Sequence, residues 1–256
     1  MNFVRRGAGS PLVLVHGIGG SHRSWDPVLP ALAKERDVVA VDLPGFGATP
    51  PLGPHPTLHD VTDALITFLD AQGLSNAHIA GSSMGARLTL ELARRGMGRN
   101  VVALDPGGFW NVPERAAFAA SLSASIRLVR ALRPMLPSLV ANPVSRTALL
   151  AQFSAHPWSL APDLVLRELE SFATSPSFDP LLRDLIVGPG QQGATVTPGR
   201  VTIGWGRNDY VCFPSQAPRA LAAFPHGALH WFERCGHFPQ WDRPDETVRL
   251  ILDATA

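Results

Sequence analysis

Short apolar runs alternate with amphipathic segments along this chain, and the alternation constrains its fold more than any other feature. Buried strands are predicted over residues 11–16, 37–42, 77–80 and 101–104. Helices are predicted between them, over residues 24–33, 57–71 and 84–95. Apolar strands that alternate with helices indicate a parallel sheet with helices on both faces, which is an α/β fold.

The alternation stops in the middle of the chain and resumes near its end. Residues 107–199 contain many prolines and no clear strand, but they show helical patterns at 115–133, 138–153, 162–174 and 178–187. Strand and helix patterns then return at 201–205, 215–224, 228–232 and 245–252. We therefore expect one core, formed by residues 1–106 and 200–256, and a helical cap at 107–199. Its expected place is over the carboxyl edge of the strands, where open α/β sheets bind ligands.

Composition excludes several classes of protein. With 256 residues and 45% hydrophobic residues, the chain can bury a full core. Its 22 basic and 21 acidic residues are balanced, so we expect no nucleic-acid partner. It has no apolar run of 18 residues and no apolar signal core, so we expect no membrane segment and a cytoplasmic location. Two cysteines, Cys212 and Cys235, are too few for a disulfide framework.

The segment Gly81–Gly85 reads G-S-S-M-G and lies between a predicted strand and a predicted helix. This context matches a nucleophile elbow, a sharp turn that holds a serine hydroxyl at the top of the sheet. Flanking glycines are needed because a Cβ atom would clash inside so tight a turn. The helix that follows directs its N-terminus at the same point and favours developing negative charge. Ser83 is therefore the candidate nucleophile.

A serine hydroxyl is a weak nucleophile, so it needs a base and an acid that orients the base. In a fold of this kind both are expected after strands, in the order serine, acid, histidine. Asp209 follows the strand at 201–205, and His237 follows the last strand. We predict that Asp209 is the acid and His237 the base, and Asp105, after an earlier strand, is the alternative acid.

The same chemistry needs backbone donors for the negative oxygen of the intermediate. One donor is expected from the residue after the nucleophile, which is Met84. The other is expected in the glycine-rich loop His16–Gly20 after the first buried strand, where Ile18 has the favourable position.

Five segments together resemble those of the α/β-hydrolase superfamily, in its capped branch. They are residues 16–20 (HGIGG), 42–47 (DLPGFG), 81–85 (GSSMG), 204–209 (GWGRND) and 235–241 (CGHFPQW). The resemblance covers the whole chain except the middle insertion, which matches the family's cap in place only. It implies a mostly parallel sheet of about seven strands, one fewer than usual, because only residues 2–5 precede the first buried strand. It also implies the roles given above for Ser83, Asp209 and His237, and a structural role for Asp42.

The resemblance implies acyl transfer to water with no metal and no organic cofactor, and a small molecule as substrate. The family's enzymes that attack through aspartate are disfavoured, because residue 83 is serine. A carboxylic ester of small or medium apolar groups is the first expectation. The candidate pocket residues are aromatic side chains of the cap and of the histidine loop, namely Trp110, Phe153, Trp158, Phe238 and Trp241.

Three alternatives to an esterase remain open. Residues 237–241 resemble the end of the carbon–carbon bond hydrolases that act on ring-cleavage products, but those enzymes carry tryptophan where Phe238 stands. They also need a buried arginine for the substrate carboxylate, for which Arg183 is the candidate. The second alternative is a lactonase, and the third is a ligand receptor with an intact triad. The sequence does not determine how many subunits assemble.

Overall fold

A seven-stranded sheet forms the centre of the computed structural model, which describes all 256 residues. The strands lie in the order β1-β3-β2-β4-β5-β6-β7, and only β1 runs antiparallel to its neighbour. This confirms the predicted sheet of about seven mostly parallel strands, and the N-terminal residues supply one short edge strand. The strands are β1 (Phe3–Arg6), β2 (Ser10–Val15), β3 (Arg36–Val41), β4 (His78–Ser82), β5 (Val101–Leu104), β6 (Val201–Gly206) and β7 (Ala228–Phe232).

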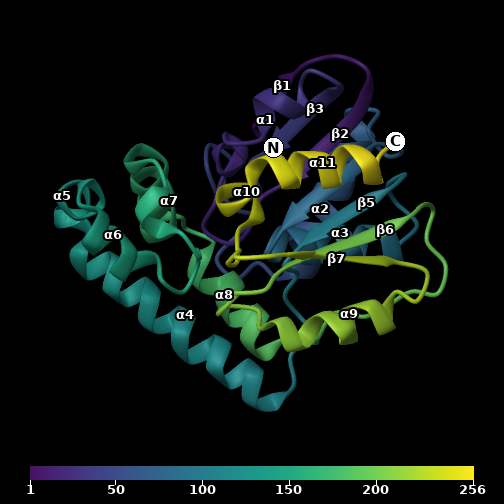
Figure 1. The fold of residues 1–256 in the computed structure, drawn as a ribbon. Coiled ribbons are helices and arrows are strands. Elements are labelled where there is room, and N and C mark those ends of the chain that lie inside the picture. Colours follow the sequence, from purple (N-terminus) through teal and green to yellow (C-terminus); the bar gives the residue numbers. More distant parts are fainter.

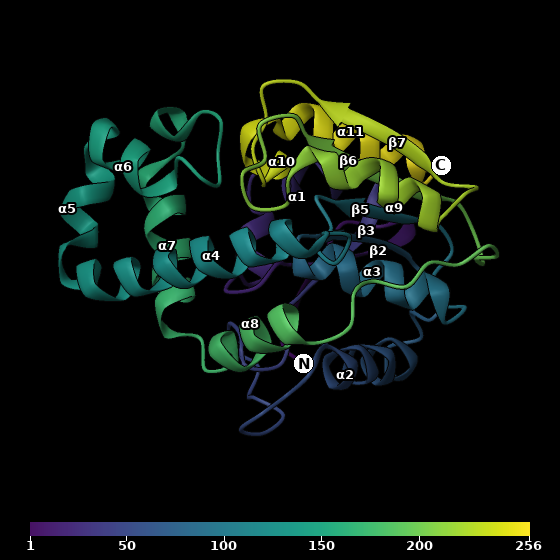
Figure 2. The ribbon, with the colours of Figure 1, turned by 90° about the horizontal axis from the view of Figure 1, so that it is seen from below.

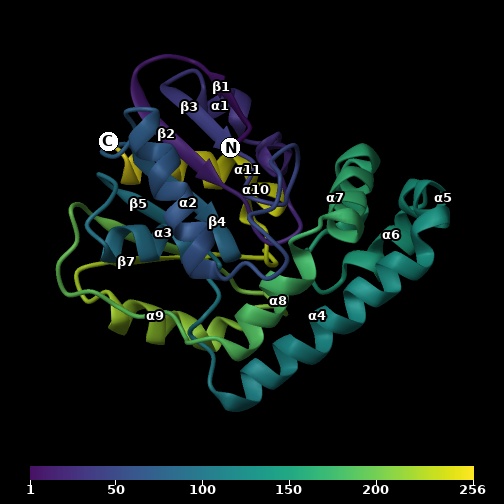
Figure 3. The same ribbon diagram turned by 180° about the vertical axis from the view of Figure 1, so that it is seen from behind.

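Helices cover both faces of this sheet (Figures 1 and 3). On one face lie α2 (Leu58–Ala71), α3 (Met84–Arg94) and α9 (Ala217–Ala223). The other face carries α1 (Leu29–Leu32) and α11 (Pro244–Ala254), and the short α10 (Pro239–Asp242) precedes α11.

The two faces of the sheet belong to separate apolar clusters because successive strand residues point to opposite sides. On β2, Val13 and Val15 pack with the side of α2 and α3, whereas Leu12 and Leu14 pack with the side of α1 and α11. All four side chains are fully buried. A strand buried on both faces has no polar side to alternate with, which explains the continuous apolar runs in the sequence.

The chain between β5 and β6 leaves the sheet and forms helices beyond the carboxyl ends of the strands (Figures 1 and 2). These helices are α4 (Val112–Leu132), α5 (Leu136–Ala141), α6 (Pro143–Leu150), α7 (Pro162–Thr174) and α8 (Phe178–Val187). The long helix α4 begins earlier than the periodicity predicts, because Asn111 caps it in a reciprocal pair of hydrogen bonds with Glu114. We refer to this helical insertion as the cap.

Prolines divide two of the predicted helices. The segment expected over 138–153 is split into α5 and α6 at Asn142, which is extended because Pro143 follows it. The segment expected over 24–33 forms a 3-10 turn, His22–Trp25, and the short α1, with Pro27 between them. No helix combines the length and the apolarity that crossing a lipid bilayer requires.

Candidate active site

Ser83 stands in a strained turn between β4 and α3. Its backbone has a φ of 56° and a ψ of −118°, which few residues other than glycine adopt. The predicted need for glycines on both sides is confirmed. A Cβ atom on Gly81 would lie 2.3 Å from the carbonyl oxygen of Gly85, and one on Gly85 would lie 2.2 Å from that of Val15. The turn therefore holds the Ser83 hydroxyl at the carboxyl edge of the sheet, at the start of α3.

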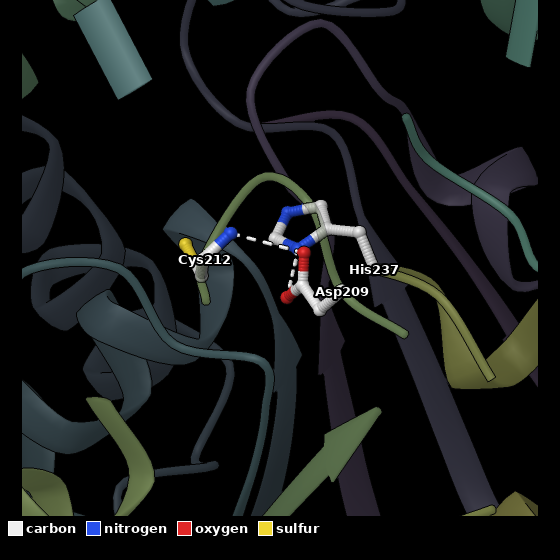
Figure 4. A group of neighbouring side chains, drawn as sticks. All are labelled: Asp209, Cys212 and His237. Carbon is white, nitrogen blue, oxygen red and sulfur yellow. Dashed lines mark hydrogen bonds and ion pairs between the residues drawn. The ribbon is translucent and has the colours of Figure 1, made fainter. Parts of the chain in front are cut away.

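The structure brings together the three side chains that the sequence analysis selected. The Nε2 atom of His237 lies 2.8 Å from the hydroxyl oxygen of Ser83. The Nδ1 atom of the same ring lies 2.8 Å from Oδ2 of Asp209. The other carboxylate oxygen of Asp209 accepts hydrogen bonds from the backbone N–H groups of Val211 and Cys212, as Figure 4 shows for Cys212. Every member of this chain of hydrogen bonds is thus fixed by its neighbours.

This arrangement can make the serine hydroxyl nucleophilic. Because Oδ2 of Asp209 accepts from Nδ1, the ring keeps its hydrogen on that atom, and the lone pair of Nε2 faces the Ser83 hydroxyl. All three side chains are buried, and exclusion of water strengthens the interaction between the carboxylate and a positively charged ring.

Asp105, the alternative acid, forms no hydrogen bond with the histidine. Its Oδ1 atom accepts a hydrogen bond of 2.8 Å from the N–H of Gly206, whereas the His237 ring faces Asp209. Burial, together with the nearby charge of Asp209, raises the pKa of Asp105 well above its usual value. The geometry therefore makes Asp209 the acid that orients the ring.

The glycine-rich loop after β2 packs directly on the serine. A Cβ atom on Gly17 would lie 3.0 Å from the Cβ of Ser83, so any other residue would push the loop and the serine apart. Ile18 and Met84, the predicted sources of backbone donors, both line the cavity above Ser83.

His16 braces the start of that loop. Its Nε2 accepts a hydrogen bond from the N–H of Leu43, and its Nδ1 donates to the carbonyl oxygen of Gly17. Burial lowers the pKa of His16 to about 4, so the ring is neutral and keeps this tautomer at neutral pH. The sequence analysis quoted His16 only as part of the loop motif.

Asp42 anchors the neighbouring loop, as its expected structural role requires. Its buried carboxylate accepts hydrogen bonds from the backbone N–H groups of His22 and Ala48 and from the side-chain amide of Asn2. It therefore joins the N-terminus to two loops at the same edge of the sheet and takes no part in the site itself.

A small cavity of about 50 Å³ lies between the core and the cap, over Ser83 and His237. Of the predicted pocket residues, Trp110, Phe153, Phe238 and Trp241 line it. Most of the other lining side chains are also apolar, and they include Phe118, Leu122, Leu150, Val165, Leu169, Phe172, Leu185 and Val211.

The prediction for Trp158 is wrong. Trp158 is 53% exposed, its ring packs against the ring of His156, and it does not line the cavity. The reason is Arg146, which is buried and donates hydrogen bonds to the carbonyl oxygens of Val140, Pro157 and Trp158. These bonds hold the Trp158 turn on the outside of the cap. The proposed carboxylate-binding Arg183 is likewise exposed and does not line the cavity.

Three polar residues of the cavity wall were missed. Ser24 and Gln240 come from the core, and Glu168 comes from α7 of the cap. For Glu168 a signal exists in the sequence. It shares the helical spacing of Val165, Leu169 and Phe172, so an acidic residue interrupts the apolar stripe of its helix.

Asp209, Cys212 and His237 place potential metal-ligating atoms within 4.8 Å of one another (Figure 4). Hydrogen bonds already engage the carboxylate and both ring nitrogens. A cysteine binds metal as the thiolate, and burial, together with the nearby charge of Asp209, raises the pKa of the Cys212 thiol well above its usual value. The cluster therefore fits a hydrogen-bonded triad with an inert thiol beside it. Cys235 is also buried, and both thiols are free.

The chain belongs to the alpha/beta hydrolase family, whose pattern it matches over residues 12–250. It is 30% identical, over 98% of its length, to the dihydrolipoyllysine-residue acetyltransferase component of the acetoin cleaving system of Cupriavidus necator. The chain spans only 65% of the length of that relative.

Two further likenesses cover nearly all of the chain. It is 28% identical to a 2-hydroxy-6-oxononadienedioate/2-hydroxy-6-oxononatrienedioate hydrolase of Dechloromonas aromatica, over 94% of this chain and 85% of the relative. Its fold is similar to the solved structure of the enol-lactonase from Burkholderia xenovorans, with a TM-score of 0.77 and 17% identity over 98% of this chain and 95% of the other. The predicted membership of the α/β-hydrolase superfamily is thus confirmed.

Proposed function

We propose that the protein is a serine hydrolase that cleaves a carboxylic ester of a small or medium apolar substrate. The observation that carries the proposal is the hydrogen-bonded chain Asp209–His237–Ser83 at the floor of an apolar cavity. Buried hydrogen bonds of this kind activate a serine for attack on a carbonyl carbon.

In the proposed mechanism, His237 accepts the proton of the Ser83 hydroxyl as its oxygen attacks the ester carbonyl. The backbone N–H groups of Ile18 and Met84 stabilise the negative oxygen of the tetrahedral intermediate, each by about 3 kcal/mol. Asp209 stabilises the positively charged ring. The ring then protonates the leaving alcohol, and an acyl-enzyme on Ser83 remains. Water, deprotonated by His237, releases the acid. The reaction needs no metal or organic cofactor.

The cavity supports a short acyl or alkyl group without a carboxylate as the bound portion. Its volume of about 50 Å³ holds a few water molecules, so the bound chain is a short one. Its wall is mainly aromatic and aliphatic, and no lysine or arginine contributes to it. A substrate carboxylate would therefore be buried there without a cationic partner, which is costly.

Carbon–carbon bond cleavage of a ring-cleavage product is the second candidate. It is favoured by the relative from Dechloromonas aromatica, whose name describes a dienedioate hydrolase. The arginines of the cap count against it. Arg146 is committed to backbone carbonyl groups, and Arg183 is exposed.

The test is the turnover of p-nitrophenyl acetate and butyrate by the wild-type protein and by Ser83→Ala. We expect ready turnover by the wild type and a loss of at least about 10⁴-fold in kcat for the variant. The variant should keep the melting temperature of the wild type, and mass spectrometry of the quenched wild-type reaction should show the added acyl group on the Ser83 peptide.

Two different outcomes would contradict the proposal. Saturable binding of an ester without turnover would identify a ligand receptor. Loss of the absorbance of a dienoate ring-fission product, without hydrolysis of either ester, would identify the carbon–carbon bond hydrolase.

A further inference from the structure

One carboxyl group interrupts the apolar wall of the cavity. Glu168 lies on the inner face of α7, the cap helix that stands between the outer helices α5 and α6 and the core (Figure 1). Apart from the triad, the cavity wall includes no other ionisable residue except the inert Cys212. The side chain of Gln240 is hydrogen-bonded to the hydroxyl of Ser82. Glu168 is therefore the polar side chain of the wall with the most unused hydrogen-bonding capacity.

The carboxyl group of Glu168 accepts a hydrogen bond from one hydroxyl group of the core. The Oγ atom of Ser24 lies 3.0 Å from Oε1 and 2.8 Å from Oε2 of Glu168. Ser24 is itself held in place, because its hydroxyl oxygen accepts from the N–H of Ser21 and its carbonyl oxygen accepts from the indole of Trp241. One hydroxyl hydrogen can satisfy only one of about four acceptor positions on a carboxylate. The remaining positions are open to another donor, and Glu168, which is half-buried, lines both the cavity and a second hollow beside Arg23 and Arg167.

The two arginines near Glu168 both face another carboxylate. Arg167 forms an ion pair of 3.2 Å with Asp26, and Arg23 lies 3.7 Å from the same carboxylate. Glu168 thus has two cations in its vicinity but an ion pair with neither. Burial raises the pKa of the Glu168 carboxyl to about 7, and the hydrogen bond from Ser24 and the charge of Arg167 offset this only in part.

We propose that Glu168 and Ser24 form a polar subsite that binds a hydroxyl or ammonium group of the substrate and excludes substrates with a carboxylate at that end. A hydroxyl or ammonium group supplies the hydrogen bonds that the carboxyl group lacks. An anionic group would be buried beside a like charge or would force Glu168 to stay protonated. This inference rests on the proposed ester hydrolysis and specifies which esters the site selects.

The experiment compares four p-nitrophenyl esters of the same chain length: the hexanoate, the 6-hydroxyhexanoate, the 6-aminohexanoate and the mono-adipate. The readout is kcat/KM of each substituted ester relative to the hexanoate, at pH 8, for the wild type and Glu168→Gln. All four esters have the same leaving group and are attacked by the same triad. The ratios therefore measure only the effect of the group at the far end of the acyl chain.

We expect the wild type to prefer the hydroxyl or the ammonium ester over the mono-adipate by at least tenfold. In Glu168→Gln this discrimination should fall at least fivefold. Glu170→Gln is the matched control. It removes the same charge from the same helix, but Glu170 pairs with Arg133 on the surface and should leave all ratios unchanged.

The pH dependence gives a second readout. The ratio of aminohexanoate to hexanoate turnover should rise between pH 6 and pH 8 in the wild type, as Glu168 ionises, and should stay flat in Glu168→Gln. Equal ratios in the wild type and Glu168→Gln, at both pH values, would overturn the subsite. Absence of hexanoate turnover by the wild type would instead refute ester hydrolysis itself.

Discussion

The core and the cap contribute to the site in different ways. In the core, backbone geometry places the reacting groups: Ser83 is held at a φ of 56°, and Gly81 and Gly85 leave no space for a Cβ atom. In the cap, packed side chains of helices form the cavity wall, among them Phe118 and Leu122 of α4. A backbone that is already strained and close-packed tolerates little change. Apolar side chains of similar size can exchange at modest cost.

The two regions meet at a hydrogen-bonded junction. The N–H of His237 donates to the carbonyl oxygen of Phe153 at 2.9 Å. The carboxylate of Asp242 accepts from the N–H groups of Ala155 and Gly236, each at 2.7 Å. The cap is therefore tied to the loop that carries the histidine, and the cavity wall is positioned against the triad. Reactivity should depend on the core, and the choice of substrate on the cap.

The largest expected effect is a difference in kcat between variants of the two buried aspartates, Asp209 and Asp105. Asp209→Asn cannot stabilise the charged ring and should lower kcat for p-nitrophenyl butyrate by about 10⁴-fold. Asp105→Asn is its matched control. An asparagine oxygen can still accept from Gly206, and the His237 ring bonds to Asp209 instead, so kcat should stay within about tenfold. Equal losses in the two variants would show that the acid has been misassigned.

The next largest effect is on stability, and it tests whether the close-packed turn of the core tolerates a Cβ atom. Gly85→Ala places a Cβ atom 2.2 Å from the carbonyl oxygen of Val15 and should lower the free energy of unfolding by at least about 3 kcal/mol. Gly53→Ala provides the comparison, because that glycine has open space around it and no positive φ. Its effect should lie within about 1 kcal/mol. Denaturant unfolding measures both, and a normal stability for Gly85→Ala would refute the steric argument.

Local patterns made most of the core predictable. The central strands β2 and β5 appear as short apolar runs, and the strand–G-x-S-x-G–helix context identified Ser83. Asp209 and His237 were found because parallel strands bring the loops after them to one edge of the sheet.

The cap was predictable only as helices. The side of each helix that faces the cavity depends on how the helices dock, and single-sequence periodicity does not contain this information. Trp158 was misplaced because buried Arg146 holds its turn outward, through bonds to backbone carbonyl groups that leave no mark on the sequence. Glu168 was missed because an acidic residue on an apolar stripe has meaning only once the opposing Ser24 is known.

The loop of His16 gives a smaller effect that depends on pH. The pKa of His16 is about 4 in the folded protein and about 6.5 when exposed, so the unfolded chain binds the proton more readily. Stability from this group is complete above pH 6.5 and is lost as the pH falls towards 4, by about 2 kcal/mol at pH 5. His16→Gln should therefore lose less stability than the wild type between pH 7.5 and pH 5 in denaturant unfolding. The exposed His226→Gln should follow the wild type, and equal losses in all three would refute the role of His16.

The smallest effect should come from the cap, and it should alter selectivity rather than rate. Leu122 is 2% exposed and lines the cavity, whereas Leu128 on the same helix is 50% exposed. Leu122→Val removes one methylene group from the wall and should raise the ratio of kcat/KM for hexanoate over butyrate esters by about tenfold. Leu128→Val should leave the ratio unchanged. If Leu122→Val instead lowered kcat for both esters equally, the cap would affect the position of the catalytic residues. The distinction between a core that sets reactivity and a cap that sets selectivity would then be wrong.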